Sequence, residues 1–537
     1  MKKLLFIIVI IAAFLRFFNL HDAPPSLTWD EASWGYNAYA LGIDGHDEFG
    51  KFLPLAYIES FGDFKPPVYA YLDIFPVKIF GLNEFATRFP SAFFGVLTVL
   101  LTYFLVKEIF GKEKEELALL SSFMLAISPW HIMLSRAAFE ANVANFFIVL
   151  GIFLFLKSMR NLPLLLPLSV ISFVIALNTF NSARIVIPIL CLILAVSFHK
   201  KLIENLKMTI LSGIIGIILI IPLLLFMRTP QAQLRFNEVN IFSDIGVINR
   251  INQEVKNDGN GKISKIIHNR RFTYGVEYLR HYLDNLTPQF LFIRGDGNPK
   301  FSIQDVGQMY LWETPLFVIG FLILFRKREK YWWIVPVWLV VGILPAGFAR
   351  ETPHALRIES SLPTFQIISA IGMVSMLGYI WKLKSKNIRN TTAVVIAGLI
   401  LINFIYFTQN YFLHYPTEYS GEWQYGYKQS VAYVSSVQNQ YKHIYITESL
   451  GRPYIYYLFY MNYNPTKFRQ DSSIYRETFG FVHVQRFSNL NFTDNIAKVT
   501  DSNALYISTP SEKPDTANVI KEFKLLNGYT ALVAYTK

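Results

Sequence analysis

The sequence predicts an α-helical polytopic membrane protein with a small α/β domain at its C-terminal end. Of its 537 residues, 53% are hydrophobic and only 16% are charged, which exceeds the apolar share of a usual soluble protein. The apolar residues gather in runs of roughly 15 to 20, the length that crosses a bilayer as a helix. Basic residues fall in alternate gaps between these runs, as expected for a chain that crosses the membrane repeatedly.

The apolar runs predict about eleven transmembrane helices, of which the shorter are the least secure and two could be re-entrant. They lie near residues 4–20, 90–110, 117–134, 140–157, 162–178, 184–198, 208–227, 313–325, 331–347, 362–381 and 392–408. The first run has no small-residue cleavage pattern, so we expect an uncleaved helix rather than a signal peptide. The lone cysteine, Cys191, falls inside a predicted span and cannot form an intrachain disulfide.

The distribution of charge predicts the orientation of the chain. Lys2 and Lys3 precede the first run, and the positive-inside rule keeps them in the cytoplasm. An odd number of spans then places the C-terminal segment outside, in a multi-pass protein of the cell membrane. The net charge of +12 is explained by this topology, so nucleic-acid binding is not predicted.

Three predicted outer segments are too long to be simple connections, and long loops often carry function. They are residues 21–89, 228–312 and 409–537, which divides the chain into a transmembrane domain (1–408) and an extracytoplasmic α/β domain (409–537). In the second segment, Arg270, Arg271, Tyr274, Tyr278 and Arg280 have near-helical spacing. In the third we expect strands at His443–Thr447, Ala504–Ser508 and Thr530–Tyr535, and helices at Tyr454–Met461 and Asp515–Phe523.

The acidic pair Asp30-Glu31 follows the first span and is the first candidate for catalysis. Glu31–Leu41 resembles a short helix that Gly42 ends, and Thr28-x-x-Glu31 fits a capping box. Glu31 is therefore either a capping residue or a catalytic one. Asp30 would lie in the first turn, where the helix dipole favours its ionised form. An ionised carboxylate can accept a proton from an attacking hydroxyl.

Lys65 is the first candidate for binding a phosphate. Pro66 and Pro67 restrict the backbone and favour an extended shape at Lys65, so its ammonium points in a defined direction. The alternative is a lysine that reaches out to lipid headgroups. Arg16, within the first span, either pairs with Asp30 or Asp63 or reaches outward.

Two short outer segments supply further candidates. After the third span come Arg136 and Glu140, which offer a cation and a second carboxylate, or simply an i,i+4 ion pair on one helix. Another segment contains His354 and Arg357, which would share a face if it were helical. The alternative there is a surface loop whose charges neutralise one another.

Several familiar sites are missing from the sequence. It contains no Walker-type phosphate loop and no strand-linked Gly-x-Gly-x-x-Gly. It also has no Cys/His cluster with zinc-site spacing and no Gly-x-Ser-x-Gly elbow. No metal ligand is assigned and no cofactor is expected with certainty, although a divalent cation remains possible.

The ordered set of short motifs between Phe14 and about Arg184 resembles the GT-C superfamily of membrane glycosyltransferases. The branch with protein O-mannosyltransferases and the lipid A aminoarabinose transferase is most similar. The motifs are Leu15-Arg16, Asp30-Glu31, Lys65-Pro66-Pro67-Val68-Tyr69, Phe80-Gly81-Leu82-Asn83-Glu84, Arg88-Phe89-Pro90-Ser91-Ala92, and Ser135-Arg136 through Glu140.

The resemblance implies an enzyme that uses a sugar carried on polyprenyl phosphate at the outer face of the membrane. It places the catalytic centre at Asp30-Glu31 and a second acidic motif at Glu140, where many members have aspartate. It also implies that Lys65 contacts the lipid phosphate, as in the aminoarabinose branch. Protein O-mannosyltransferases more often have histidine there, so the acceptor (protein, lipid or glycan) stays open.

The sequence therefore predicts an inverting glycosyltransferase with Asp30 as the base. Glu31 and Glu140 are further catalytic candidates, and Lys65, Arg136, His354 and Arg357 are candidate ligands of the donor phosphate. The alternatives are a transporter or flippase of a lipid-linked sugar, a polymerase or ligase of lipid-linked glycans, and a membrane-anchored binding protein. A membrane-anchored binding protein would leave most of the predicted spans unexplained.

Overall fold

A computed structural model describes residues 2–233, 240–243, 245–477 and 481–537. The chain forms two compact units, each built from segments distant in sequence. A helical unit comprises Met1–Ala12, Gly95–Leu134 and Ala141–Phe404, and a sheet-containing unit comprises Ala13–Phe94, Ser135–Glu140 and Ile405–Lys537. The boundary predicted between residues 408 and 409 separates a transmembrane domain from an extracytoplasmic domain. It is not the same kind of boundary as the division into compact units, and it stays a prediction.

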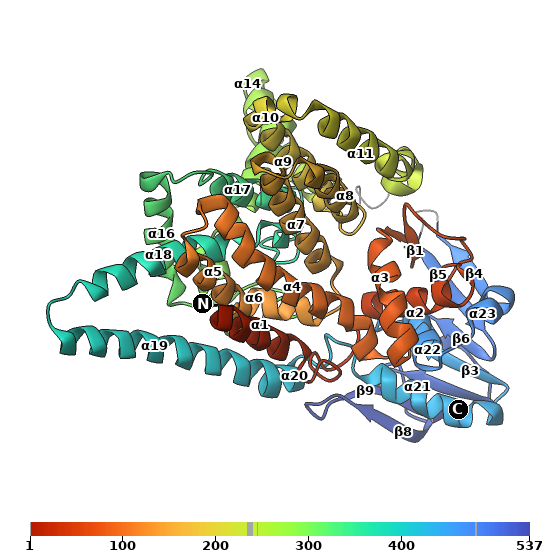
Figure 1. Cartoon of the computed structure of the whole chain (residues 1–537). Helices are drawn as coiled ribbons and strands as arrows, with labels where there is room; N and C mark the ends of the chain where they lie inside the picture. Colours follow the sequence, from red (N-terminus) through yellow and green to blue (C-terminus); the bar gives the residue numbers. More distant parts are fainter. Residues whose placement is uncertain (1, 234–239, 244, 478–480) are drawn as a thin grey trace. The chain divides into compact units, whose positions relative to one another are not determined.

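Each predicted span overlaps a helix of the structure, because long apolar runs satisfy their backbone groups best as helices in a bilayer. The helices are α1 (Lys2–Phe17), α4 (Glu84–Phe110), α5 (Glu115–Ile127), α6 (Pro129–Arg136), α7 (Glu140–Arg160), α8 (Leu166–Leu177), α9 (Ala183–Ser197), α11 (Leu206–Met227), α16 (Glu313–Lys327), α17 (Ile334–Gly347), α18 (Thr364–Trp381) and α19 (Lys386–Gln409). Figure 1 shows them in sequence order by colour.

Within the described residues, five helices are long and apolar enough to cross a membrane, or six if the bent pair α5–α6 is one span. Three further apolar helices are shorter, at Pro163–Leu177, Ala183–Ser197 and Ile334–Gly347. A multi-pass membrane protein is thus confirmed, and the count of eleven stays a prediction.

Helices α16 and α18 cross closely inside the helical unit. A Cβ added to Gly320 would lie 1.9 Å from the carbonyl oxygen of Ile368, and one added to Gly372 would lie 2.0 Å from that of Leu316. Small residues allow such close approach between membrane helices, where packing rather than the hydrophobic effect drives association. These two glycines therefore define the crossing point.

The sheet-containing unit has one seven-stranded sheet with strand order β4-β5-β6-β3-β7-β9-β8. The strands are β3 (His443–Thr447), β4 (Ser473–Arg476), β5 (Val482–Phe487), β6 (Leu490–Thr493), β7 (Ala504–Ser508), β8 (Asn518–Lys524) and β9 (Thr530–Thr536). β3 pairs in parallel with both β6 and β7, and the other pairs are antiparallel. With helices α21 (Gly426–Val437), α22 (Pro453–Tyr460) and α23 (Pro465–Asp471), this confirms the predicted α/β module.

Four of the five elements predicted in this module are confirmed, and one is wrong. Asp515–Phe523 was expected to be a helix, but Asn518–Lys524 forms β8, at the edge of the sheet. All of its residues except Phe523 are exposed, so no alternation of buried and exposed residues marks it as a strand. Its conformation comes from pairing with β9.

One face of the sheet shares its hydrophobic core with the first outer segment. Leu27, Ala32, Tyr36 and Phe61 pack in the same cluster as residues of β3, β7 and α22. Ala32 and Tyr36 belong to α2 (Trp29–Asp44), which contacts both α22 and α3 (Val68–Phe80). The helix that carries the acidic pair is therefore built into the core of the C-terminal sheet.

Candidate active site

Helix α2 begins where the capping box predicted. The Thr28 backbone N–H donates to Glu31 Oε2 at 2.9 Å, and the Glu31 N–H donates to Thr28 Oγ1 at 3.3 Å. These reciprocal bonds satisfy amides that the first helical turn leaves without partners. The helix continues past Gly42 and ends at Gly45, which has a left-handed φ of 78°. Asp30 lies in the first turn, as expected.

Lys65 forms an ion pair with Asp30. It ends strand β2 (Asp63–Lys65), which pairs antiparallel with β1 (Ile58–Ser60), and Pro66 follows it directly. Its Nζ donates to Asp30 Oδ1 and lies 5.1 Å from the ring centroids of both Trp34 and Phe61. The Lys65 side chain is only 8% exposed, so it does not reach out to lipid headgroups.

Asp30 remains open to solvent on the other side of this pair. Its side chain is 54% exposed, in contrast to that of Lys65. An exposed carboxylate next to a fixed ammonium can receive a proton from a molecule that enters the site. Because lysine has three N–H donors, Lys65 can hold Asp30 and an anionic oxygen of a ligand together.

Glu140 lies within electrostatic range of the Asp30–Lys65 pair. It is the first residue of α7 and is partly buried. It interacts electrostatically with Lys65, Asp30 and Asp63. The structure thus brings Asp30, Lys65 and Glu140 together, although the sequence separates them widely.

Glu31 is fully buried and holds the surrounding chain in place. Its Oε1 accepts bonds from Arg88 Nε and from the Ala138 N–H, each at 2.9 Å. Arg88, also buried, donates as well to the carbonyls of Leu20 (3.1 Å) and Pro24 (2.8 Å). This geometry favours the capping and positioning interpretation of Glu31 over a catalytic one, because its oxygens already accept bonds from the protein.

Arg136 is placed differently from the expectation that it binds phosphate. Its guanidinium is fully buried and donates to the carbonyls of Leu15 (2.7 Å), Phe18 (2.7 Å) and Ala23 (2.8 Å). It also donates to Tyr411 Oη at 3.2 Å. We therefore replace the phosphate role with a structural one, in which Arg136 fixes the turn after α1.

Two alternatives that the sequence left open for arginines are not observed. Arg136 ends α6 and Glu140 begins α7, so the two do not form an ion pair along one helix. Arg16 is fully buried and does not reach outward to the membrane surface.

His354 and Arg357 belong to the helical unit and are described apart from the Asp30 site. Residues 351–358 are not helical, so the shared helix face was not found. Burial, and then the charge of Arg357, lower the pKa of His354 to about 3. The imidazole is therefore neutral and brings no positive charge to a phosphate. Its backbone N–H donates to Asn285 Oδ1 at 2.9 Å, and its Nδ1 lies 3.9 Å from Asp296 Oδ2.

The C-terminal domain contributes polar contacts that the sequence did not suggest. The Gln424 side-chain oxygen accepts a bond from the Trp29 N–H at 3.2 Å and one from Tyr456 Oη. The Gln424 amide nitrogen donates to the Leu450 carbonyl at 3.1 Å. These contacts support the start of α2, directly before Asp30. No motif marked Gln424, because its partners lie far away in the sequence.

A second buried polar group behind α2 was also missed. Glu48 is fully buried, and it accepts bonds from Asn37 Nδ2 at 3.2 Å and Tyr454 Oη at 3.1 Å. Burial, and then the neighbouring Asp47, raise the pKa of Glu48 to about 8. Since Asn37 is on α2 and Tyr454 on α22, this network joins the two helices.

Within the described residues, no group of three or more His, Cys, Asp or Glu side chains could hold a metal ion.

The fold is similar to that of solved GT-C membrane enzymes. ArnT from Cupriavidus metallidurans, solved bound to undecaprenyl phosphate, aligns with 99% of this chain and 98% of its own. The TM-score is 0.54 and the identity 12%. The Archaeoglobus fulgidus oligosaccharyltransferase, solved with a tethered acceptor peptide, aligns with 85% of this chain and 62% of its own, with a TM-score of 0.52 and 14% identity.

The sequence comparisons point to a more specific family than the structural comparisons do, but they cover less of the chain. Residues 6–236 match the model of the family described as dolichyl-phosphate-mannose-protein mannosyltransferase. An uncharacterized protein of Aquifex aeolicus is 32% identical over 197 residues, and the putative mannosyltransferase YkcB of Bacillus subtilis is 33% identical over 96. These matches span 36% and 13% of the two relatives. The resemblance to the protein O-mannosyltransferase branch of the GT-C enzymes is thus confirmed.

Proposed function

We propose that the protein is an inverting glycosyltransferase that moves a sugar from a polyprenyl-phosphate donor to a hydroxyl acceptor at the outer face of the membrane. The observation that carries this proposal is the ion pair between exposed Asp30 and buried Lys65 at the start of α2. It supports the proposal because a carboxylate that could accept a proton and an ammonium that could bind a phosphate lie next to each other.

Lys65 has the role of binding the donor phosphate. Nucleotide sugars are cytoplasmic, so a transferase that faces outward needs a donor anchored in the bilayer. The lipid phosphate is then the leaving group, and its growing negative charge must be met by a fixed cation. Burial between Trp34 and Phe61 holds the ammonium of Lys65 in place for this purpose.

Asp30 has the role of the base. Its carboxylate accepts the proton of the acceptor hydroxyl as that oxygen attacks the anomeric carbon. Attack from the side opposite the lipid phosphate inverts the anomeric configuration. Glu140, beside Lys65 and Asp30, is retained as the second acidic residue of the site.

The comparisons support the donor more strongly than the acceptor. The ArnT structure was solved with undecaprenyl phosphate, and the matched family is described by a dolichyl-phosphate sugar. Both names point to a lipid-linked phosphate. The acceptor, a hydroxyl of a protein, lipid or glycan, is left to mass spectrometry of surface glycoconjugates from cells with and without the protein.

The test is transfer from a polyprenyl-phosphate sugar by purified protein in liposomes. Replacing Asp30 with Asn should lower turnover by roughly 10²–10⁴-fold, the usual contribution of a general base. Asp22→Asn is the matched control, because Asp22 is an exposed carboxylate on the same segment. Unchanged turnover in Asp30→Asn would exclude Asp30 as the base, and a product with retained configuration would exclude inversion.

The same preparation separates the alternatives. A flippase would move the lipid-linked sugar across the bilayer without forming a new glycosidic bond, and Asp30→Asn would leave the movement intact. A polymerase or ligase would accept only long lipid-linked glycans.

Orientation is tested by replacing Cys191 with Ser and Asp22 with Cys. An impermeant thiol reagent applied to intact cells should label residue 22, and labelling only after lysis would contradict the proposed topology.

A further inference from the structure

Helix α15 (Arg270–Asp284) exposes one continuous apolar face. Phe272, Val276, Leu279 and Leu283 follow the spacing of a single helix face, and each is half or more exposed. The neighbouring short helix α14 (Lys262–Ile267) adds exposed Ile263, Ile266 and Ile267. A contiguous apolar face of this kind marks a surface that contacts a partner or a membrane.

Another side of α15 packs on α17, a shorter apolar helix that is predicted to span the membrane. Tyr282 Oη donates to the Val340 carbonyl at 3.0 Å and Tyr278 Oη to the Leu344 carbonyl at 3.1 Å. His281 Nδ1 bonds to the Ala349 carbonyl at 2.7 Å. These carbonyls lie between the middle of α17 and the residues just beyond its end. Since basic residues precede α17, the positive-inside rule assigns this end to the outer leaflet.

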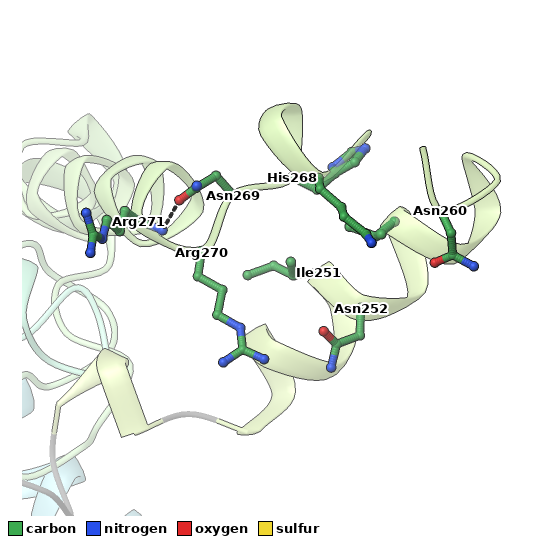
Figure 2. Close-up of a pocket in the computed structure, with 9 residues that line it drawn as sticks. Ile251, Asn252, Asn260, His268, Asn269, Arg270 and Arg271 are labelled. Atoms are coloured by element: carbon green, nitrogen blue, oxygen red, sulfur yellow. Dashed lines mark hydrogen bonds between the residues drawn. The ribbon is translucent and has the colours of Figure 1, made fainter. Parts of the chain in front are cut away.

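Basic residues surround a cavity beside the apolar face. It has a volume of about 540 Å³, and its lining includes Ile251, Asn252, Lys265, His268, Arg270 and Arg271. Figure 2 shows the Arg270 side chain extending from the start of α15 toward α13 (Ile245–Asn257), where Ile251 and Asn252 lie. His268 contacts Glu254 at 3.1 Å and Asp258 at 2.8 Å, whereas Lys265, Arg270 and Arg271 leave a surplus of positive charge.

We propose that α14 and α15 lie in the membrane interface and that the basic cavity beside them binds the phosphate headgroup of an anionic phospholipid. An exposed apolar face next to Lys and Arg side chains is the pattern of helices that lie in the plane of a membrane surface. The contacts with the carbonyls of Leu344 and Ala349, near and beyond the outer end of α17, support a position where headgroups meet acyl chains. The occupant is thus a bulk lipid, and its site belongs to the helical unit, whereas Asp30 belongs to the sheet-containing unit.

The first experiment measures depth in the bilayer. Full-length protein with Cys191→Ser is spin-labelled at Phe272→Cys or Leu279→Cys and reconstituted in phosphatidylglycerol–phosphatidylcholine vesicles. Leu526→Cys, on the C-terminal domain, is the control. Labels at 272 and 279 should collide with oxygen and be shielded from a water-soluble nickel complex, whereas the label at 526 should show the reverse. Equal access of nickel to all three sites would overturn the interfacial placement.

The second experiment measures headgroup preference by counting bound lipids with native mass spectrometry. Removing three charges by Lys265→Gln, Arg270→Gln and Arg271→Gln should reduce the preference for phosphatidylglycerol over phosphatidylcholine by at least about fivefold. That is the equivalent of about 1 kcal/mol, the contribution of one basic residue at an anionic surface. The control removes the same charge at exposed Lys442, Lys498 and Lys524, and both triple variants are first shown to keep the parent Tm.

Each other outcome of this experiment counts against the proposal. An equal loss in both triple variants would mean that net charge, rather than this cavity, sets the preference. Displacement of phosphatidylglycerol by inorganic phosphate would mean a site for soluble anions. A loss of undecaprenyl phosphate binding with phosphatidylglycerol unaffected would assign the cavity to the donor instead.

Discussion

The replacement Glu31→Gln separates a positioning role of Glu31 from a catalytic one. The carboxylate is fully buried and accepts bonds of 2.9 Å from Thr28 N–H, Arg88 Nε and Ala138 N–H. Glutamine keeps the shape but presents an NH₂ group to donors and leaves the buried charge of Arg88 without its partner. Breaking a buried pair in this way costs about 3–5 kcal/mol. Asp30→Asn also takes the partner from the buried ammonium of Lys65, but the Asp30 side chain is 54% exposed, so this replacement should cost less stability than Glu31→Gln.

The assay is thermal unfolding in detergent, followed by tryptophan fluorescence, with transfer activity measured below the transition. Glu31→Gln should lower the Tm clearly and Asp30→Asn should lower turnover, each with little of the other effect. The double replacement Glu31→Gln with Arg88→Gln should recover part of the lost stability, because it removes the uncompensated charge. A Glu31→Gln protein with the parent Tm and no turnover would refute this interpretation and return Glu31 to the chemistry.

Three further predictions rest on other contacts. Lys65→Ala should weaken use of the donor more than use of the acceptor, with Lys51→Ala as the control; an effect confined to the acceptor would contradict the phosphate role. Glu48, whose pKa is raised from 4.5 to about 8, stabilises the folded protein at low pH, and this contribution is lost as the pH rises through about 8. The Tm should therefore fall between pH 5 and 9, and Glu48→Gln should flatten this dependence; an equal slope in both proteins would exclude Glu48 as the cause. Gly372→Val should destabilise the helical unit because its Cβ would meet the Leu316 carbonyl. The control Gly378→Val, which has open space around it, should keep the parent Tm. Equal Tm values for the two variants would argue against the close crossing of α16 and α18.

The elements were predictable from sequence where a local pattern determines them. Long apolar runs located the helices, the capping box located the start of α2, and alternating or buried apolar residues located β3, β7 and β9. The edge strand β8 was missed because its exposed residues have no such alternation and its conformation depends on β9.

The site was partly predictable for a related reason. Asp30 and Lys65 were found as short motifs, and the structure confirms that they are neighbours. Arg136 was predicted to bind a phosphate because it lies near an outer loop, and the sequence does not indicate which groups it contacts in the fold. These are the carbonyls of Leu15, Phe18 and Ala23, more than a hundred residues away. Gln424 and Glu48 were missed for the same reason: buried polar networks are properties of the fold, not of spacing.

The joint packing of Ala32, Tyr36 and the β3–β7 core has a practical consequence for chimaeras. A graft that exchanged only the C-terminal 129 or so residues between relatives would cut through one hydrophobic interior, exposing apolar area worth about 25 cal/mol per Å². The transplantable module is instead the discontinuous set 13–94, 135–140 and 405–537. Swapping that set whole would carry the Asp30–Lys65 pair along with the sheet.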